Sequence, residues 1–174
     1  VQKIYEKILT HEKDDIKNSF VTYNEAIDLI KPTTLLIVTD TQSPNRAMFP
    51  ELLNRVKNVS VIDHHRAGEV GYKETLSYYV ETSASSTVEL VTEMFLFYNA
   101  NFKSDKLIAS IMLAGIVVDT NNFTYRTRTR TFEAASTLNT MGADMVLVRK
   151  LLRDSYEEER RIASAMVNAE IFEK

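Results

Sequence analysis

Three short apolar runs, each ending on an aspartate, are the main pattern along this chain. They are Leu35 to Asp40, Val59 to Asp63 and Ala114 to Asp119. The first two are rich in leucine or β-branched residues and too short for helices, so each predicts a buried strand of a parallel sheet. The third closes a longer apolar segment, and its pattern fits a helix or a strand. We expect the three ends to meet at one edge of the sheet, where ligands bind in open α/β folds.

Amphipathic segments between these runs predict helices, because their apolar residues are spaced three and four apart. The expected helices are residues 1–9, 24–30 with Thr22 as cap, a crossover helix through Phe49 to Val56, one starting after Ser83 to Thr87, one starting at Ser104 and Asp105, 132–140 closed by Gly142, and 145–152 capped by Asp144. Leu76 to Val80 alternates as a further strand does. The fold class predicted is therefore α/β, a single domain with a mostly parallel β-sheet flanked by helices.

The charged segment at the end of the chain predicts a boundary. We expect residues 1–155 to form the domain, and residues 156–174, which mix glutamate and arginine with spaced apolar residues, to form a helical linker toward another domain. The chain starts on Val1 rather than on methionine. We therefore expect it to be part of a longer protein.

Composition narrows the chemistry of any site. The net charge of −3 and the pI of about 5.7 argue against binding to long nucleic acid. The chain has no cysteine, so a metal would be held by carboxylate oxygen and imidazole nitrogen. No run approaches the roughly 18 apolar residues of a membrane span.

The predicted sheet edge gathers acidic and imidazole groups. Asp40, Asp63 and Asp119 would meet there, together with His64 and His65. Unpaired carboxylates repel one another, and burying them costs several kcal/mol, so a divalent metal site is the economical explanation. The alternative is that Asp63 caps a turn and the two histidines are ordinary loop residues.

Hydroxyl residues precede the helix expected after Thr87. Ser85 and Ser86 could cap that helix, or they could hold a phosphate at its positive end. The sequence leaves both open. Arg46, Arg66 and Arg126 are loop arginines that could neutralise phosphate charge, although such residues are often merely solvated.

Several motifs in this order resemble the DHH phosphoesterase superfamily, and within it the membrane-anchored cyclic-di-AMP phosphodiesterases. They are Val61-Ile62-Asp63-His64-His65-Arg66, Ala84-Ser85-Ser86-Thr87 followed by Glu89-Leu90, Ala114-Gly115-Ile116-Val117-Val118-Asp119-Thr120, Arg130-Thr131-Phe132-Glu133-Ala134-Ala135 and Gly142-Ala143-Asp144. The resemblance covers nearly the whole chain.

The resemblance implies a role for each candidate residue. Asp40 would bridge two ions, usually Mn²⁺, and His64 and Asp119 would complete the shell of one. Asp63 would support the site from behind, and His65 would face the phosphate, so we expect Asp63 and His65 to be catalytic. Ser85, Ser86 and Arg66 are the expected phosphate- and substrate-binding residues. A pair of ions about 3.5 to 4 Å apart can activate a bridging water for hydrolysis of a phosphodiester.

The family's first motif and its C-terminal substrate domain, DHHA1, are absent from the sequence. We therefore expect the chain to be the core of a larger enzyme, nearly inactive alone, holding at most one ion weakly and prone to form homo-oligomers. By resemblance, the parent is a bacterial cell-membrane protein with this domain in the cytoplasm, hydrolysing cyclic di-AMP to linear pApA. Alternatives are a short-oligonucleotide nuclease or phosphatase, a pyrophosphatase, and a non-catalytic regulatory domain.

Overall fold

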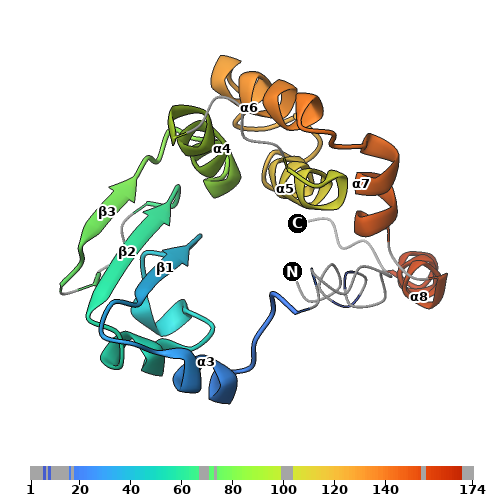
Figure 1. The fold of residues 1–174 in the computed structure, drawn as a ribbon. Helices are drawn as coiled ribbons and strands as arrows, with labels where there is room; N and C mark the ends of the chain where they lie inside the picture. The colour runs from blue at the N-terminus through green and yellow to red at the C-terminus, as the bar shows by residue number, and fades with distance from the viewer. Residues whose placement is uncertain are drawn as a thin grey trace.

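The computed structural model describes residues 6, 8, 16, 18–66, 71–72, 74–98, 104–153 and 156–169. Its elements are α3 (Tyr23–Leu29), β1 (Leu35–Thr39), η1 (Pro44–Arg46), η2 (Pro50–Asn54), β2 (Asn58–Asp63), β3 (Ser77–Val80), α4 (Thr87–Tyr98), α5 (Lys106–Asp119), α6 (Thr129–Thr140), α7 (Met145–Leu152) and α8 (Tyr156–Val167). The helix expected over residues 1–9 falls almost entirely outside the described residues. The α/β class is confirmed, with the sheet on one side and α4 to α7 on the other (Figure 1).

The described strands form one parallel sheet in the order β1-β2-β3. Thr39 pairs with Ile62, and Asp63 pairs with Val80. The strands therefore end together, and the residues that follow β1 and β2 emerge at the same edge. The predicted strands are confirmed to within a residue or two at each end.

The connection from β1 to β2 differs from the expected crossover helix. It contains two short 3₁₀ helices, η1 and η2, each with a proline at its start. Proline has no N–H to donate and clashes with the preceding turn, so a second proline at position 50 prevents one continuous α-helix. Leu52 and Val56 are nevertheless buried, as the amphipathic spacing predicted.

The helical side has the larger core. Nine described residues from α5, α6, α7 and the turn before α7 form one buried cluster, which includes Ile116, Leu138 and Val148. Helix α4 contacts β2, α5 and α6, so it joins this core to the sheet. Gly115 makes the α4–α5 approach possible, because a Cβ at this position would lie 2.7 Å from Cγ2 of Val88.

Most predicted helix ends are confirmed. Thr22 and Glu25 form a capping box at α3, and Asp105 and Asp144 accept from backbone N–H groups at the starts of α5 and α7. Gly142 follows α6 with a φ of 105°, a left-handed conformation that favours glycine.

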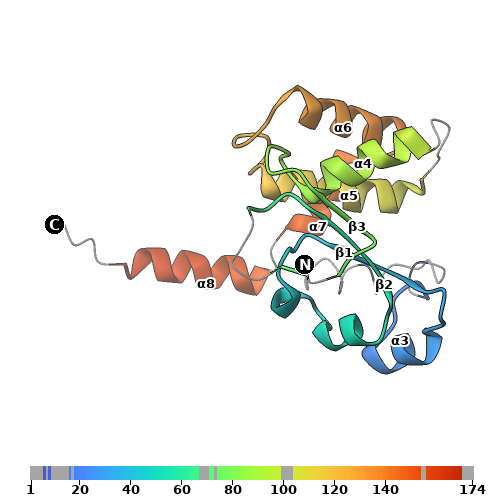
Figure 2. The ribbon, with the colours of Figure 1, turned by 90° about the vertical axis from the view of Figure 1, so that its left-hand side faces the viewer.

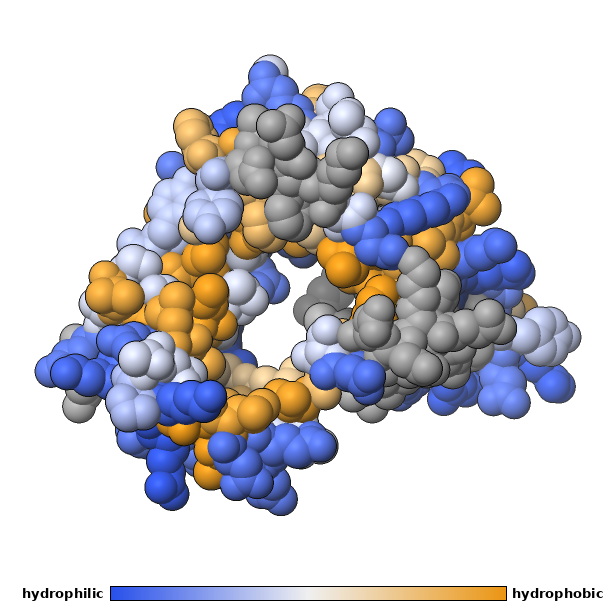
Figure 3. Space-filling view, viewed as in Figure 1, coloured by the Kyte–Doolittle hydropathy of each residue, from blue (hydrophilic) through white to orange (hydrophobic). Residues whose placement is uncertain are grey.

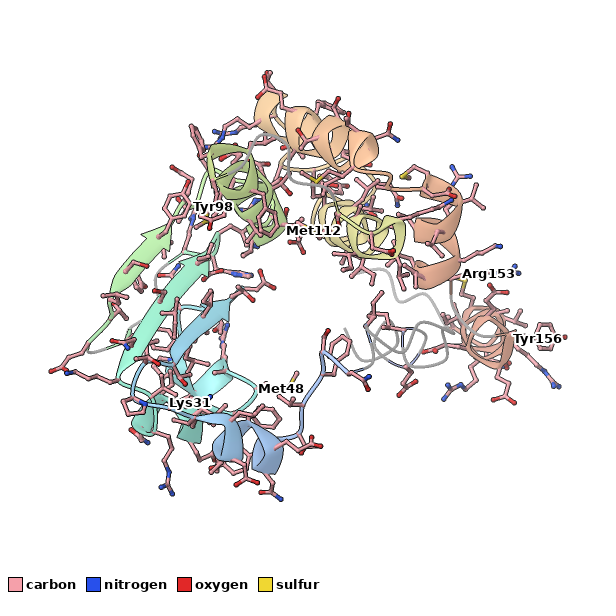
Figure 4. The ribbon with its side chains drawn as sticks, in the orientation of Figure 1. Lys31, Met48, Tyr98, Met112, Arg153 and Tyr156 are labelled. Atoms are coloured by element: carbon pink, nitrogen blue, oxygen red, sulfur yellow. The ribbon has the colours of Figure 1, made fainter. Side chains whose placement is uncertain are left out.

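The sheet is covered less completely than the helical core. Leu36 and Val38 pack with Val59 and Val61, whereas Leu35 and Ile37 on the opposite face of β1 are 47% and 53% exposed. Figure 3 shows an opening between the sheet and the helices, bordered by apolar residues. Figure 4 places Met48 on the sheet side of this opening and Met112 on the helix side.

Helix α8 extends away from the rest of the described chain (Figure 2). All of its residues are exposed except the partly buried Glu158. Within the part of the chain that the structure describes, no helix combines the length and the apolar character needed to cross a bilayer.

Candidate metal centre

Asp40 turns the chain sharply at the end of β1. Its φ is 65°, a left-handed conformation that aspartate tolerates better than most residues, and its N–H donates to the Ile62 carbonyl at 3.0 Å. The Oδ1 atom accepts a hydrogen bond of 2.9 Å from the Thr87 hydroxyl. The start of α4 therefore fixes a carboxylate that the sheet edge presents to solvent.

Asp63 organises the turn that follows β2. The carboxylate is fully buried, and its Oδ1 accepts from the N–H of His64 at 2.8 Å and from the N–H of His65 at 3.2 Å. The same oxygen lies 2.7 Å from Nδ1 of His65. An ionised carboxylate only accepts hydrogen bonds, so Nδ1 of His65 carries the proton. In the neutral ring, Nε2 is then the nitrogen without a proton.

His64 lies between two carboxylates. Its Nε2 is 3.5 Å from Oδ1 of Asp40 and 3.6 Å from Oδ2 of Asp119. The side chain is 4% exposed, and neither ring nitrogen has a hydrogen-bond partner among the described residues. Two atoms bound to one ion at about 2.0 to 2.2 Å lie roughly 3 to 4 Å apart. An ion between these three side chains would therefore satisfy a buried nitrogen that is otherwise unpaired.

The four residues Asp40, Asp63, His64 and His65 each offer one ligand atom, and these atoms lie within 4.8 Å of one another. Oxygen and imidazole donors in this combination suit Mn²⁺, as they do several other divalent ions. The residues present thus fit the metal that the sequence analysis expected.

Asp119 reaches the centre from the last residue of α5, not from a strand. The sequence left open whether this segment is a helix or a strand, and the structure shows a helix, with the three aspartates converging as expected. Burial raises the pKa of the Asp119 carboxyl, and Asp40 raises it too, while His64, His65 and Arg126 act in the opposite direction. A bound cation would favour the charged carboxylate.

A strained turn holds Asp119 in place. Asn121, Asn122 and Phe123 are all left-handed, with φ values of 47°, 56° and 60°. Such residues cost of order 1 to 3 kcal/mol each and persist only where their surroundings impose them. Here the buried Thr120 hydroxyl donates to the Ile116 carbonyl and accepts from the N–H of Phe123, whose ring stacks on Phe132.

Ser85 and Ser86 are both buried, and both take part in structural hydrogen bonds. Ser86 Oγ accepts from the N–H of Glu89 at 3.2 Å, which caps α4. Ser85 donates to the buried Glu89 carboxylate at 2.6 Å, and Thr131 donates to the same oxygen at 2.8 Å. The capping alternative thus has direct geometric support, whereas the hydrogen bonds described for the two serines do not include His65.

The candidate arginines are placed differently. Arg66 is exposed directly after His65, and Arg46 is exposed in η1. Arg126 donates to the Thr82 carbonyl at 3.2 Å and lies close enough to Asp119 to lower its pKa. Arg126 is therefore the arginine that the described contacts connect to the centre.

Two residues near the centre were not singled out from the sequence. Gln42 is buried and donates to the His65 carbonyl, and Tyr72 has a buried hydroxyl without a hydrogen-bond partner among the described residues. Burial raises the pKa of Tyr72, and so do Asp63 and Tyr78. No local sequence signal identifies either residue, because their neighbours come from other elements.

Comparison with known proteins gives the family. Residues 3–116 match the DHH family, N-terminal domain. The chain is 41% identical over 157 residues to the cyclic-di-AMP phosphodiesterase GdpP of Bacillus subtilis, covering 90% of this chain and 24% of that protein. It is 47% identical over 149 residues to GdpP of Geobacillus thermodenitrificans, covering 86% and 23%.

Among solved structures, an exopolyphosphatase-related protein from Bacteroides fragilis is similar, with a TM-score of 0.73 and 20% identity. That likeness covers 86% of this chain and 45% of the other. At this identity the likeness shows the fold only. The chain spans about a quarter of the length of the two curated relatives. With most of the chain matched by the family model, the chain belongs to the DHH family.

Proposed function

We propose that this chain is the metal-binding core of a phosphodiesterase that hydrolyses a cyclic dinucleotide. The observation that carries the proposal is the position of the buried, unpaired Nε2 of His64 between Asp40 and Asp119. A structural cap would not need these three groups to face one point. A metal site does.

In this proposal Asp40, His64 and Asp119 would hold Mn²⁺, and the 57% exposed side chain of Asp40 could also bind a second ion. When bound, the metal would supply an activated water and neutralise charge at phosphorus. Asp63 orients the His65 ring and stabilises it when protonated, and Nε2 of His65 then donates to a phosphate oxygen. Arg126 and Arg66 add positive charge for the phosphate.

We propose cyclic di-AMP as substrate and linear pApA as product, because the relatives named above are cyclic-di-AMP phosphodiesterases. Water adds at phosphorus, one P–O bond breaks, and the ring opens into a linear dinucleotide. Ser85 and Ser86 position the backbone at the start of α4 toward this substrate rather than offering their own bonded hydroxyls. The parent protein would be membrane-anchored, with this domain in the cytoplasm.

The test compares the 174-residue chain with a version extended upstream, both assayed for cyclic-di-AMP hydrolysis with saturating Mn²⁺. We expect turnover by the extended version, little by the shorter chain, and none after His64→Ala. Equal turnover by both lengths would show that the residues named here suffice without an upstream motif. No turnover by the extended version, nor by one that also carries the C-terminal substrate domain, with Mn²⁺ or Mg²⁺, would remove the phosphodiesterase assignment.

A Ser85→Ala, Ser86→Ala double variant of the extended version separates capping from substrate binding. If both serines act only through α4, the variant loses thermal stability and keeps its KM for cyclic di-AMP. A large rise in KM at unchanged stability would restore the phosphate-binding alternative for their hydroxyls.

A further inference from the structure

Gln42 is a buried polar side chain to which the proposed mechanism assigns no role. It is 6% exposed and lies two residues after Asp40, in the loop that leaves β1. Its Nε2 donates to the backbone carbonyl of His65, and its Oε1 accepts from the Tyr78 hydroxyl at 2.7 Å. One amide thus joins the residues that follow β1 and β2 to a side chain on β3.

The orientation of this amide is dictated by its partners. A carbonyl can only accept, so the nitrogen of Gln42 must face His65. A tyrosine hydroxyl can donate as well as accept, so Tyr78 satisfies the remaining Gln42 oxygen. Rotating the amide by half a turn would place the Gln42 oxygen against the His65 carbonyl oxygen, which is unfavourable. The contacts therefore allow one orientation of the amide.

The His65 carbonyl needs such a donor because of where it lies. The ladder between β2 and β3 ends at the Asp63–Val80 pair, so His65 lies beyond the sheet hydrogen bonds. On the other side of the residue, Asp63 holds the backbone N–H and the Nδ1 atom of the ring. Asp63 and Gln42 therefore hold His65 from two sides.

We infer that Gln42 is a positioning residue for His65, with Tyr78 as its support. The inference rests on the proposed function, since it assigns His65 a place beside the phosphate. Without the Gln42 donor, the His65 carbonyl loses its partner, the turn can move, and the contact between Asp63 and the ring is weakened. A displacement of about 1 Å in a catalytic group can cost about 100-fold in rate.

The experiment uses the variants Gln42→Ala, Gln42→Glu and Tyr78→Phe. Gln42→Glu keeps the size of the side chain and the acceptor for Tyr78, but it replaces the N–H donor by an oxygen. Ser110→Ala is the matched control, because its buried hydroxyl also makes two hydrogen bonds, to Lys106 and from Asp144, away from the centre. All four are made in the chain extended upstream.

We expect Gln42→Ala and Gln42→Glu to lower kcat about 10- to 100-fold with little change in KM. Tyr78→Phe, which keeps the bond to His65, should lower kcat less. Ser110→Ala should lower the melting temperature and leave kcat unchanged. If Gln42→Glu turns over like the wild type, or if all variants lose activity only in proportion to stability, the inference is wrong.

A second readout does not depend on activity. Long-range ¹H–¹⁵N spectra of the metal-free protein, at a pH where the ring is neutral, report which nitrogen of His65 carries the proton. We expect the Nδ1–H form in the wild type and a mixture of both forms in Gln42→Glu. An unchanged Nδ1–H signal in Gln42→Glu would overturn the inference even if the wild type proves not to hydrolyse cyclic di-AMP.

Discussion

The sheet and the helical region contribute to the same centre but differ in how they are stabilised. The helical region has a buried cluster of nine described residues, whereas Val38, Val59 and Val61 form the buried cluster on one face of the sheet. Four of the five residues around the centre nevertheless come from the sheet edge, and Asp119 comes from the helices. The helical region thus supplies one partly exposed carboxylate, Asp119, whereas the sheet edge supplies the buried His64 and the more exposed Asp40.

This difference in packing indicates that a bound metal would stabilise the contact between the sheet and the helical region. Asp40 and His64 lie at strand ends, and Asp119 ends the helix at the centre of the larger core. An ion shared by the three would join the two regions close to where α4 contacts β2. Metal binding should therefore stabilise the sheet against local opening more than it stabilises the helices.

The largest expected difference between the two regions is in packing. Leu138→Ala removes a fully buried side chain from the nine-residue cluster and should lower the free energy of unfolding by about 2 to 5 kcal/mol. Val59→Ala removes two methyl groups from the small sheet cluster and should cost about 1 to 2 kcal/mol. Urea denaturation of both variants measures the difference. Equal costs would mean that the sheet is packed as tightly as the helices.

A smaller effect on stability is expected for Asp119→Asn, which should stabilise the protein without metal and destabilise it, relative to the wild type, with metal. Because burial raises the pKa of this carboxyl, its charged form destabilises the metal-free protein at neutral pH. Asp119→Asn should therefore unfold at a slightly higher temperature than the wild type without metal. With Mn²⁺ at about 100 times its Kd, the wild type should gain about 2.7 kcal/mol and the variant almost nothing.

Thermal unfolding with and without Mn²⁺ tests this prediction. Asp144→Asn is the control, since Asp144 is an acidic residue of the helical region outside the metal centre. It should keep the full Mn²⁺ gain. A variant at Asp119 that also keeps the gain would exclude this residue as a ligand.

The sequence predicted the parts of the centre that depend on local pattern. Apolar runs ending at Asp40 and Asp63 identified the strand ends, and parallel strands bring such ends together. Asp119 was expected to join them, but a run of isoleucine and valine fits a helix as well as a strand, so its element was left open. The crossover α-helix was wrong, since the segment after Phe49 forms only the short 3₁₀ helix η2, although the apolar spacing correctly identified Leu52 and Val56 as buried.

Gln42 could not be predicted, for a physical reason. Its two partners lie 23 and 36 residues further along the chain, so its role exists only in the folded sheet. For Ser85 and Ser86 the sequence left two interpretations open, because a hydroxyl before a helix can cap the helix or bind a ligand. Glu89, which accepts hydrogen bonds from both Ser85 and Thr131, favours the structural alternative through contacts that exist only in the folded chain.

The smallest expected effect compares two acidic caps, Asp144 at α7 and Glu25 at α3. Both carboxyls have a lowered pKa, Asp144 through Lys106 and the N–H of Val146, and Glu25 through Thr22. A carboxyl with a lowered pKa stabilises the fold above its ordinary pKa, and this contribution is lost as the pH falls through the lowered value. Asp144→Asn and Glu25→Gln should therefore lower the melting temperature at pH 7 and have little effect below about pH 3.

The two carboxyls should still differ in their effect on the melting temperature, because one joins two helices and the other stabilises the start of one helix. Asp144 Oδ2 lies 2.7 Å from Nζ of Lys106 and so ties α7 to α5, whereas the bonds of Glu25 within the described part of the chain lie in its own capping box. We expect the loss at Asp144 to exceed the loss at Glu25, and added salt to reduce it, since both partners are partly exposed. Melting curves at pH 3 and 7, in low and high salt, measure both variants. A larger loss at Glu25 would show that the sheet side, despite its smaller core, depends more on its helix cap than the helical region does.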